Sequence, residues 1–198
     1  TFSYKSIWSS IFHCISQLFQ SLVSLQLPQE GVYLIDLFIP LLTQMIEIRQ
    51  IATNDSSYKT LESSIGHAIT LFGAPQLCSQ VIPLKLPQAT STDFHILQEQ
   101  LKQSNMWLLP LIAGYMTINS SNLSWFQSSL LPSAIELYQC AYYLSNTNQE
   151  THQTLAHALM AIVNNIWDCF IPCCNLPNDV MTSYKSLAKT LTSILQDI

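Results

Sequence analysis

The sequence predicts an all-α fold built from long apolar helices joined by short turns. Along most of the 198 residues, apolar side chains recur at spacings of three and four, which is the period of an α-helix. Prolines and clusters of Asn, Asp and Ser separate these stretches, and none of them shows the alternation of a β-strand. Long helices with short connections are typical of domains in which helices pack on helices.

Each expected helix is marked by its apolar positions and by the residues at its ends. The first ends at Leu27-Pro28, since a residue before proline avoids the helical region. Pro40 lies inside the second, where a proline kinks or splits a helix. Ser124–Gln127 and Thr147–Glu150 have the spacing of capping boxes, which open helices. The expected helices cover 3–25, 31–51, 58–72, 75–81, 94–103, 107–116, 124–145, 147–171 and 177–195, with a loop near 82–93.

A longer regularity runs through the prolines that are flanked by apolar residues. Two of the intervals between them match the repeat length of about 40–47 residues in HEAT and armadillo units. Such units are helix pairs that stack and bury one another's faces. The sequence therefore predicts a HEAT/armadillo-like α-solenoid of stacked antiparallel helix pairs, with a closed bundle as the alternative. The prolines are Pro40, Pro83, Pro110, Pro132 and Pro172, with separations of 43, 27, 22 and 40.

The composition indicates either a chain that meets a partner over much of its surface or one segment of a longer protein, and we favour the second interpretation. Only 10% of the residues are charged and 48% are hydrophobic, whereas charged residues make up about 25% of an average domain. We therefore expect residues 1–198 to be a single segment of a longer solenoid. A membrane span is not expected, because the most apolar window, Leu155–Cys174, contains His157, Asn164, Asp168 and Pro172.

The charge pattern argues against tight nucleic-acid binding by this segment alone. The formal net charge is −5, and the seven Lys and Arg residues are scattered singly. Binding to phosphates requires clustered cations. Lys185 and Lys189 are the one pair on a helix face, so they are the candidate contacts to RNA or to a protein partner. The alternative is that they form a solvated helix face.

No catalytic or metal-binding pattern is present. Cys169-x3-Cys173-Cys174 is the one dense thiol cluster, but a structural zinc site needs four ligands and no second pair is found. We expect the six cysteines to be free thiols, mostly buried, in a reducing compartment. The sequence has no G-x-S-x-G elbow, and its four glycines build no phosphate loop. We therefore predict no enzyme activity, no metal, no cofactor and no small-molecule substrate.

The four tryptophans lie within apolar stripes. We expect them to be core anchors, with an aromatic groove for partner peptides as the alternative. They are Trp8, Trp107, Trp125 and Trp167.

The stretch 166–191 carries a more specific pattern, I-W-x-x-F-x-P-x-C-x-x-P-x-D-V-x-x-S-Y-K-x-L-A-K-T-L. This order resembles the signature of the ribosomal-RNA-processing protein twelve family, which comprises large HEAT/armadillo-repeat proteins of the nucleolus. Segments 61–86, 106–116 and 124–132 resemble the same family in the same order. Ser186 departs from it, since members often have Gly there, and Ile112-Ala113-Gly114 stands where a charged pair is usual. The signature positions are Trp167, Pro172, Cys174, Pro177, Asp179, Ser183, Tyr184 and Lys185.

The resemblance implies a non-catalytic scaffold in small-subunit ribosome assembly and export. Its implied partners are proteins of the pre-ribosomal particle, pre-rRNA and nuclear transport factors. Its implied location is the nucleolus and nucleus, with shuttling to the cytoplasm and no membrane association. The alternative is a HEAT-type nuclear transport receptor or adaptor that shares the architecture alone.

Overall fold

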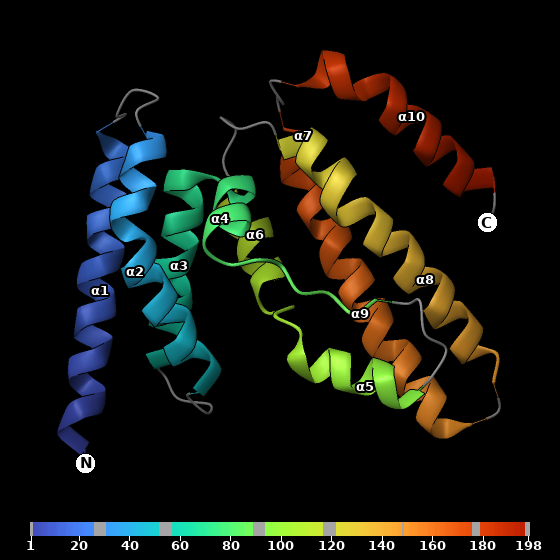
Figure 1. The fold of residues 1–198 in the computed structure, drawn as a ribbon, viewed down its shortest axis with the longest axis horizontal. Helices are drawn as coiled ribbons and strands as arrows, with labels where there is room; N and C mark the ends of the chain where they lie inside the picture. Colours follow the sequence, from blue (N-terminus) through green and yellow to red (C-terminus); the bar gives the residue numbers. More distant parts are fainter. Residues whose placement is uncertain are drawn as a thin grey trace. The chain divides into compact units, whose positions relative to one another are not determined.

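The computed structural model describes residues 2–25, 31–51, 57–88, 94–116, 122–147, 149–175 and 179–196. Every regular element within these ranges is a helix, which confirms the all-α prediction (Figure 1). Two compact units are present, Thr1–Pro83 with Gly114–Thr117 and Leu84–Ala113 with Ile118–Ile198. The elements are α1 (Phe2–Ser24), α2 (Gly31–Ile51), α3 (Ser57–Phe72), α4 (Ala74–Gln80), α5 (Phe94–Gln103), α6 (Leu108–Tyr115), α7 (Asn122–Trp125), a π-helical turn (Phe126–Leu130), α8 (Leu131–Ser145), α9 (Glu150–Cys173) and α10 (Val180–Gln196).

In the first unit, α1 and α3 run parallel and pack closely. The Ser64 hydroxyl donates to the Phe12 carbonyl oxygen at 2.7 Å, and Ser16 Oγ lies 2.8 Å from His67 Nδ1. The paired residues are 52 and 51 positions apart in the sequence. Because this separation stays nearly constant from one contact to the next, the two helices run in the same direction. Ser64 is fully buried at this contact, and its small side chain lets the two backbones approach each other.

The helix that separates α1 and α3 in the sequence, α2, runs antiparallel to α3. The Phe38 ring lies 6.0 Å from the Phe72 ring, and Arg49 Nε donates to Glu62 Oε1 at 2.7 Å near the other end of the helix pair. Phe19 of α1 is fully buried and lies edge-on to Phe38, with ring centroids 5.2 Å apart. The three helices therefore share one aromatic core.

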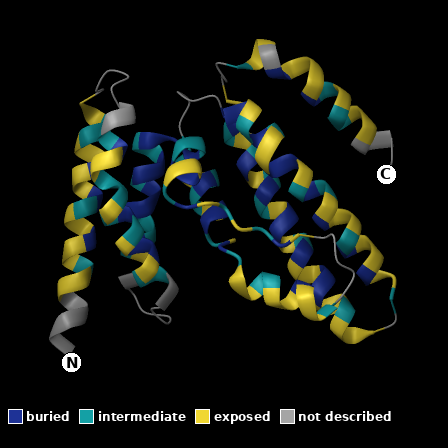
Figure 2. Ribbon diagram, viewed as in Figure 1, coloured by how far each residue is buried: buried dark blue, intermediate teal, exposed yellow. Residues whose placement is uncertain are grey.

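In the second unit, α8 and α9 form the central antiparallel pair, and their buried faces meet along most of their length (Figure 2). Among the described residues, α9 is the one helix long and apolar enough to cross a membrane, judged by length and composition alone. A core helix passes the same test, and α9 buries a continuous stripe in this unit. The stripe is Leu155, Ala156, Leu159, Ile162, Val163, Ile166, Cys169 and Cys173.

The helix α10 repeats this arrangement, because it runs parallel to the α7–α8 run. Asp179 Oδ2 accepts from the Ser124 backbone N–H at 2.6 Å, and Gln127 Nε2 donates to Ser186 Oγ at 2.5 Å. The separations are 55 and 59 residues. Each unit thus contains a helix, an antiparallel partner and a third helix parallel to the first, which is how HEAT-type repeats stack. The fold is an all-α, HEAT-like array of helix pairs.

The proline spacing underestimates most of the separations between stacked helices. Their contacts join residues 47 to 59 positions apart, whereas two proline intervals had indicated about 40–47. The prolines do not occupy equivalent positions, because Pro40 lies in the middle of α2 and Pro83 lies outside any helix. Pro110 lies inside α6, and Pro132 opens α8.

Both predicted capping boxes are wrong. Ser124 lies inside the helical run that starts at Asn122, so it does not precede the helix as a cap does. Its backbone N–H donates to the Asp179 carboxylate. At the second box, α9 begins at Glu150 after Gln149. The Thr147 hydroxyl does not cap the helix, because it donates to the Leu144 carbonyl oxygen at 2.7 Å.

The prolines interrupt their helices less than expected. Around Pro40, α2 continues as one helix. Pro132 follows a π-helical turn, Phe126–Leu130, which accommodates the missing N–H without ending the helical run. Pro172 lies in the last turn of α9, which ends at Cys173, and the next helix begins at Val180. The predicted breaks at 27–28 and 177 lie outside the described residues, as does part of the expected loop, at 89–93.

The tryptophans are not the core anchors that the sequence predicted. Trp8 is 44% exposed, and Trp107, Trp125 and Trp167 are half-buried. Phe and aliphatic side chains fill the cores instead, with Phe19 and Phe126 among the largest fully buried residues.

The aromatic core of the first unit provides a direct test of this packing. We expect Phe19→Ala to lower the free energy of unfolding by about 3–5 kcal/mol, since it leaves a cavity among three helices. Its neighbour Leu18 is 45% exposed, so Leu18→Ala should cost less than about 1 kcal/mol. Urea denaturation of both variants measures the difference. Equal losses would contradict the assignment of the buried face of α1.

Candidate functional site

The signature residues lie at the end of α9 and along α10, in the second unit. Trp167 and Pro172 belong to α9, and Cys174 is the exposed residue that follows the end of this helix. Pro177 lies outside the described residues. The rest surround the start of α10, so the signature forms a junction between two helices. They are Asp179, Ser183, Tyr184 and Lys185.

An aromatic cluster fixes α9 to the helical run before α8. The ring centroids of Phe126 and Phe170 are 4.9 Å apart, and Trp167 lies 6.0 Å from Phe126 and 5.8 Å from Phe170. Phe126 is fully buried at the first position of the π-helical turn. The half-buried Trp167 therefore packs against Phe126 where α9 meets the π-helical turn.

Asp179 holds the start of α10 against the start of α7. Burial raises the pKa of the Asp179 carboxyl, but hydrogen bonds from the Ser124 hydroxyl and from the backbone N–H groups of Ser124, Asp179 and Leu123 outweigh it. The net effect lowers the pKa below its ordinary value of 3.8. An ionised carboxylate at the N-terminus of a helix also interacts favourably with the helix dipole. Asp179 thus acts as an N-terminal cap supplied by a different repeat.

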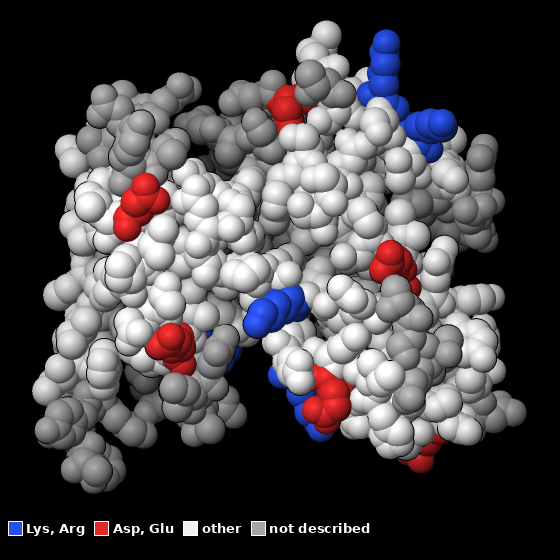
Figure 3. All heavy atoms as spheres, viewed as in Figure 1, with Lys and Arg blue, Asp and Glu red and all other residues white. Residues whose placement is uncertain are grey.

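The outward side of α10 is exposed. Met181 is 89% exposed and Tyr184 is 64% exposed, and Lys185 and Lys189 are exposed beside them. Within Val180–Gln196 there is no Asp or Glu. Figure 3 shows the basic side chains over α10 as separate groups without a continuous basic patch. This surface can accept an apolar or aromatic contact with two flanking positive charges.

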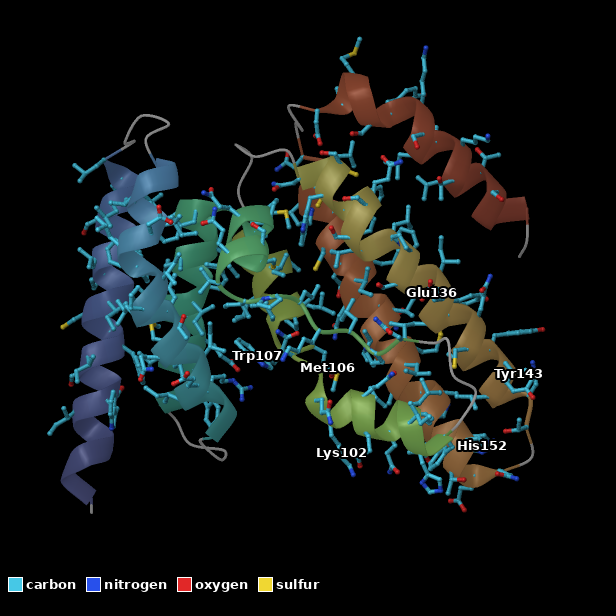
Figure 4. The ribbon with its side chains drawn as sticks, viewed as in Figure 1. Lys102, Met106, Trp107, Glu136, Tyr143 and His152 are labelled. Carbon is cyan, nitrogen blue, oxygen red and sulfur yellow. The ribbon has the colours of Figure 1, made fainter. Side chains whose placement is uncertain are left out.

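A second exposed aromatic group lies on α8. Tyr138, Tyr142 and Tyr143 are 41%, 63% and 61% exposed. Figure 4 shows Tyr143 near the end of α8, with Glu136 earlier on the same helix and His152 at the start of α9. Tyrosine presents an apolar ring and a polar tip, so such residues suit protein contacts.

The cysteine cluster does not build a metal site. The Cys169 thiol donates to the Leu109 carbonyl oxygen at 3.3 Å. Burial, followed by the neighbouring Cys169, Cys174 and Asp179, raises the pKa of the Cys173 thiol to about 12. A neutral buried thiol is a poor metal ligand and a poor nucleophile. In the parts of the chain that the structure describes, no group of three His, Cys, Asp or Glu residues could hold a metal ion.

A polar network that the sequence pattern did not reveal lies between α1 and α3. His67 Nε2 is 2.6 Å from Gln20 Nε2, and His67 Nδ1 is 2.8 Å from Ser16 Oγ. With the Gln20 amide as donor, His67 Nε2 accepts, and its Nδ1–H donates to Ser16. These side-chain hydrogen bonds connect α1 to α3 beside the buried contact of Ser64 with Phe12. Tyr115 closes the network from the side, 5.2 Å from the His67 ring.

The cysteines differ enough in exposure to be distinguished by alkylation. Cys14 and Cys174 are exposed, whereas Cys78 and Cys173 are buried. Burial raises the pKa of Cys78 to about 12 as well. We expect a maleimide to modify Cys14 and Cys174 first in the folded protein, because their thiols are exposed, whereas burial keeps Cys78 and Cys173 in the unreactive thiol form. Peptide mass spectrometry after timed quenching measures the order, and early modification of Cys173 would contradict its placement.

The Asp179 contact should depend on pH. Its folded-state pKa is lowered from 3.8, so its contribution to stability is complete above that pH and is lost as the pH falls through the folded-state pKa. We expect Asp179→Asn to melt below the wild type at pH 7. The difference should shrink below pH 3.8. Thermal denaturation of both proteins across this range tests the contact, and a difference that does not vary with pH would refute it.

Comparisons with known proteins agree with the helical stacking. The family model for "Ribosomal RNA-processing protein 12, HEAT repeats" matches residues 1–198. The chain is similar to the human "RRP12-like protein", with 28% identity over 131 residues, and to the chicken "RRP12-like protein", with 24% identity over 131 residues. These alignments cover 66% of this chain and 9% of each relative.

No solved structure matches the chain. Because the family model covers all 198 residues and the described helices stack as HEAT repeats do, the chain belongs to the Ribosomal RNA-processing protein 12 HEAT-repeat family.

Proposed function

We propose that this chain is a segment of a non-catalytic HEAT-repeat scaffold that acts in ribosome biogenesis through protein and ribonucleoprotein contacts. The observation that carries the proposal is the family match over residues 1–198 together with the stacked helices of both units. Since the chain spans 9% of the relatives it matches, the function belongs to a longer solenoid to which this segment contributes surface.

The finer role is the assembly and export of the small-subunit precursor. In this role the protein works in the nucleolus and nucleus and shuttles to the cytoplasm with the particle. Its partners are proteins of the pre-ribosomal particle, pre-rRNA and nuclear transport factors. The family name supports rRNA processing as the setting, and the exposed outward side of α10 supports a role in binding other molecules.

Within this segment, the outward side of α10 is the proposed contact surface. Tyr184 is 64% exposed and lies beside Lys185, and one helical turn later Lys189 adds a second cation. Exposed aromatic side chains contribute strongly to protein interfaces. Two cations supply too little charge for tight binding of RNA by themselves, so protein contacts dominate and RNA contacts are secondary.

Affinity purification of the tagged protein from its own cells tests the function. We expect small-subunit assembly factors and precursor rRNA to be recovered with it. Recovery of nuclear transport factors alone would favour the transport receptor or adaptor. The absence of both assembly factors and precursor rRNA would refute the proposal.

A matched pair of tyrosine variants locates the contact surface. Tyr184→Ala should reduce the recovery of partners, whereas Tyr143→Ala, which removes a side chain of similar exposure (61% against 64%), should leave recovery unchanged. The reason is that Tyr184 is flanked by the two lysines of α10. If both variants behave alike, α10 is not the specific contact.

Direct RNA binding by this segment should be weak and due to the two lysines. We expect a Kd no tighter than about 10 µM at physiological salt. Replacing both Lys185 and Lys189 with Ala should flatten the dependence of log K on log salt by about 1.4 for single-stranded RNA. A Lys59→Ala/Lys85→Ala variant makes the same change in charge at exposed positions and should have less effect. Fluorescence anisotropy at several salt concentrations measures both slopes.

A further inference from the structure

The two lysines of α10 do not stabilise the helix that carries them. Lys185 and Lys189 are exposed and lie four residues apart, on one side of the helix, where two like charges repel each other. Val180–Gln196 contains no Asp or Glu that could compensate. The last turn of α10, where a cation would stabilise the helix dipole, contains no basic residue. The pair therefore has no stabilising role within α10.

Other cations of the chain are used inside the fold. Arg49 Nε lies 2.7 Å from Glu62 Oε1, and Lys102 Nζ lies 2.6 Å from Glu99 Oε1 on α5. Between Lys102 and Lys185 the sequence contains no Lys or Arg. The pair on α10 thus follows a long stretch without positive charge, and its charge faces outward from the fold.

An apolar contact lies next to the two charges. Met181 is 89% exposed and Tyr184 is 64% exposed. Met181 precedes Lys185 by four residues, so Met181, Lys185 and Lys189 form a row with about 6 Å between neighbours along the helix axis. Methionine adapts its shape to a partner, and tyrosine combines an apolar ring with a polar tip. The outward side of α10 therefore offers an apolar contact followed by two positive charges.

We propose that the outward side of α10 binds an acidic segment of a partner protein, in which an apolar residue packs on Met181 and Tyr184 and two carboxylates pair with Lys185 and Lys189. This inference rests on the proposed function, because it names the chemistry of the partner at the same surface. An exposed ion pair stabilises a contact only weakly. The apolar residue therefore supplies most of the affinity, and the two lysines select an acidic partner.

The charges of the second unit favour a short acidic segment over RNA. Tight binding to a phosphate backbone requires more clustered cations than two. The same unit exposes Glu136, Glu150 and Asp168, which repel a long polyanion. A short segment can contact α10 alone, and its apolar residue gains from Met181, whereas a phosphate group does not.

Zero-length cross-linking detects the proposed ion pairs directly. A carbodiimide joins a lysine amine to a carboxylate only where the two groups touch. It would be applied to the tagged protein purified with its partners from its own cells. We expect Lys185 or Lys189 to be joined to an Asp or Glu of a different protein, close to an apolar residue of that protein. The exposed pair of Lys102 and Glu99, at 2.6 Å, is the internal positive control.

Two results of the cross-linking would overturn the proposal. In the first, Lys102 is joined to Glu99 while Lys185 and Lys189 are joined to nothing. In the second, Lys185 and Lys189 are joined only to carboxylates of their own polypeptide, which would mean that the two charges belong to the fold.

A charge swap tests whether the contact is specific. Lys185→Glu/Lys189→Glu should reduce recovery of the cross-linked partner at least about fivefold, because like charges would then face each other. Changing the two carboxylates of the partner to Lys should restore recovery, which a merely structural role of the lysines would not allow. Lys59→Glu/Lys85→Glu makes the same change in charge at exposed positions and should leave recovery unchanged. A loss that the swap does not restore would overturn the proposal.

RNA as the occupant gives a different result. Ultraviolet cross-linking of α10 to precursor rRNA, together with loss of the partner after nuclease treatment, would mean that this surface binds RNA and would overturn the proposal.

The outcomes also separate the acidic partner from the proposed function. If assembly factors and precursor rRNA are recovered but Lys185 and Lys189 cross-link to no acidic segment, the proposed function stands and the acidic partner is ruled out. If the lysines cross-link to an acidic segment while neither assembly factors nor precursor rRNA are recovered, the proposed function fails and the chemistry of the partner stands.

Discussion

The close parallel packing of α1 and α3 is the constraint on which the first unit depends. The Ser64 hydroxyl reaches the Phe12 carbonyl oxygen at 2.7 Å, which requires a small side chain at the contact. Because 48% of the residues are hydrophobic, helices of this chain carry apolar side chains on more than one side. A single antiparallel pair of helices would leave some of these side chains exposed to water. Stacking a third helix parallel to the first solves this problem, and it also makes the fold extendable by repetition.

The second unit uses the same geometry with different chemistry. There α10 is held to the α7–α8 run by hydrogen bonds from Ser124 to Asp179 and from Gln127 to Ser186. Polar contacts of this kind fix register and direction while burying less apolar surface. The outward side of α10 stays available as a result, with Met181 and Tyr184 largely exposed. In a scaffold, such a helix can both continue the stack and contact a partner.

The sequence predicted the helices well and their detailed roles less well. Apolar spacing located the helices because burial imposes the helical period on the chain. The capping box at Ser124 failed because Asp179, 55 residues later, bonds its N–H, and no local pattern contains that information. The same limit applies to Gln20 and His67, whose contact spans 47 residues. Tryptophan was expected in the cores, but Phe19 and Phe126 occupy them, since hydrophobicity does not specify which large side chain reaches the centre.

Hydrogen exchange on a Ser64→Leu variant tests the stacked-repeat account most directly. A leucine cannot occupy the space in which the Ser64 hydroxyl lies 2.7 Å from the Phe12 carbonyl oxygen. If α1 and α3 form one stack, the amides of both helices should lose protection together in the variant, while those of α8 and α9 keep it. The contradicting result would be seen in the wild type. If its α3 amides were fully protected while its α1 amides exchanged freely, the two helices would not depend on each other, which would contradict the account.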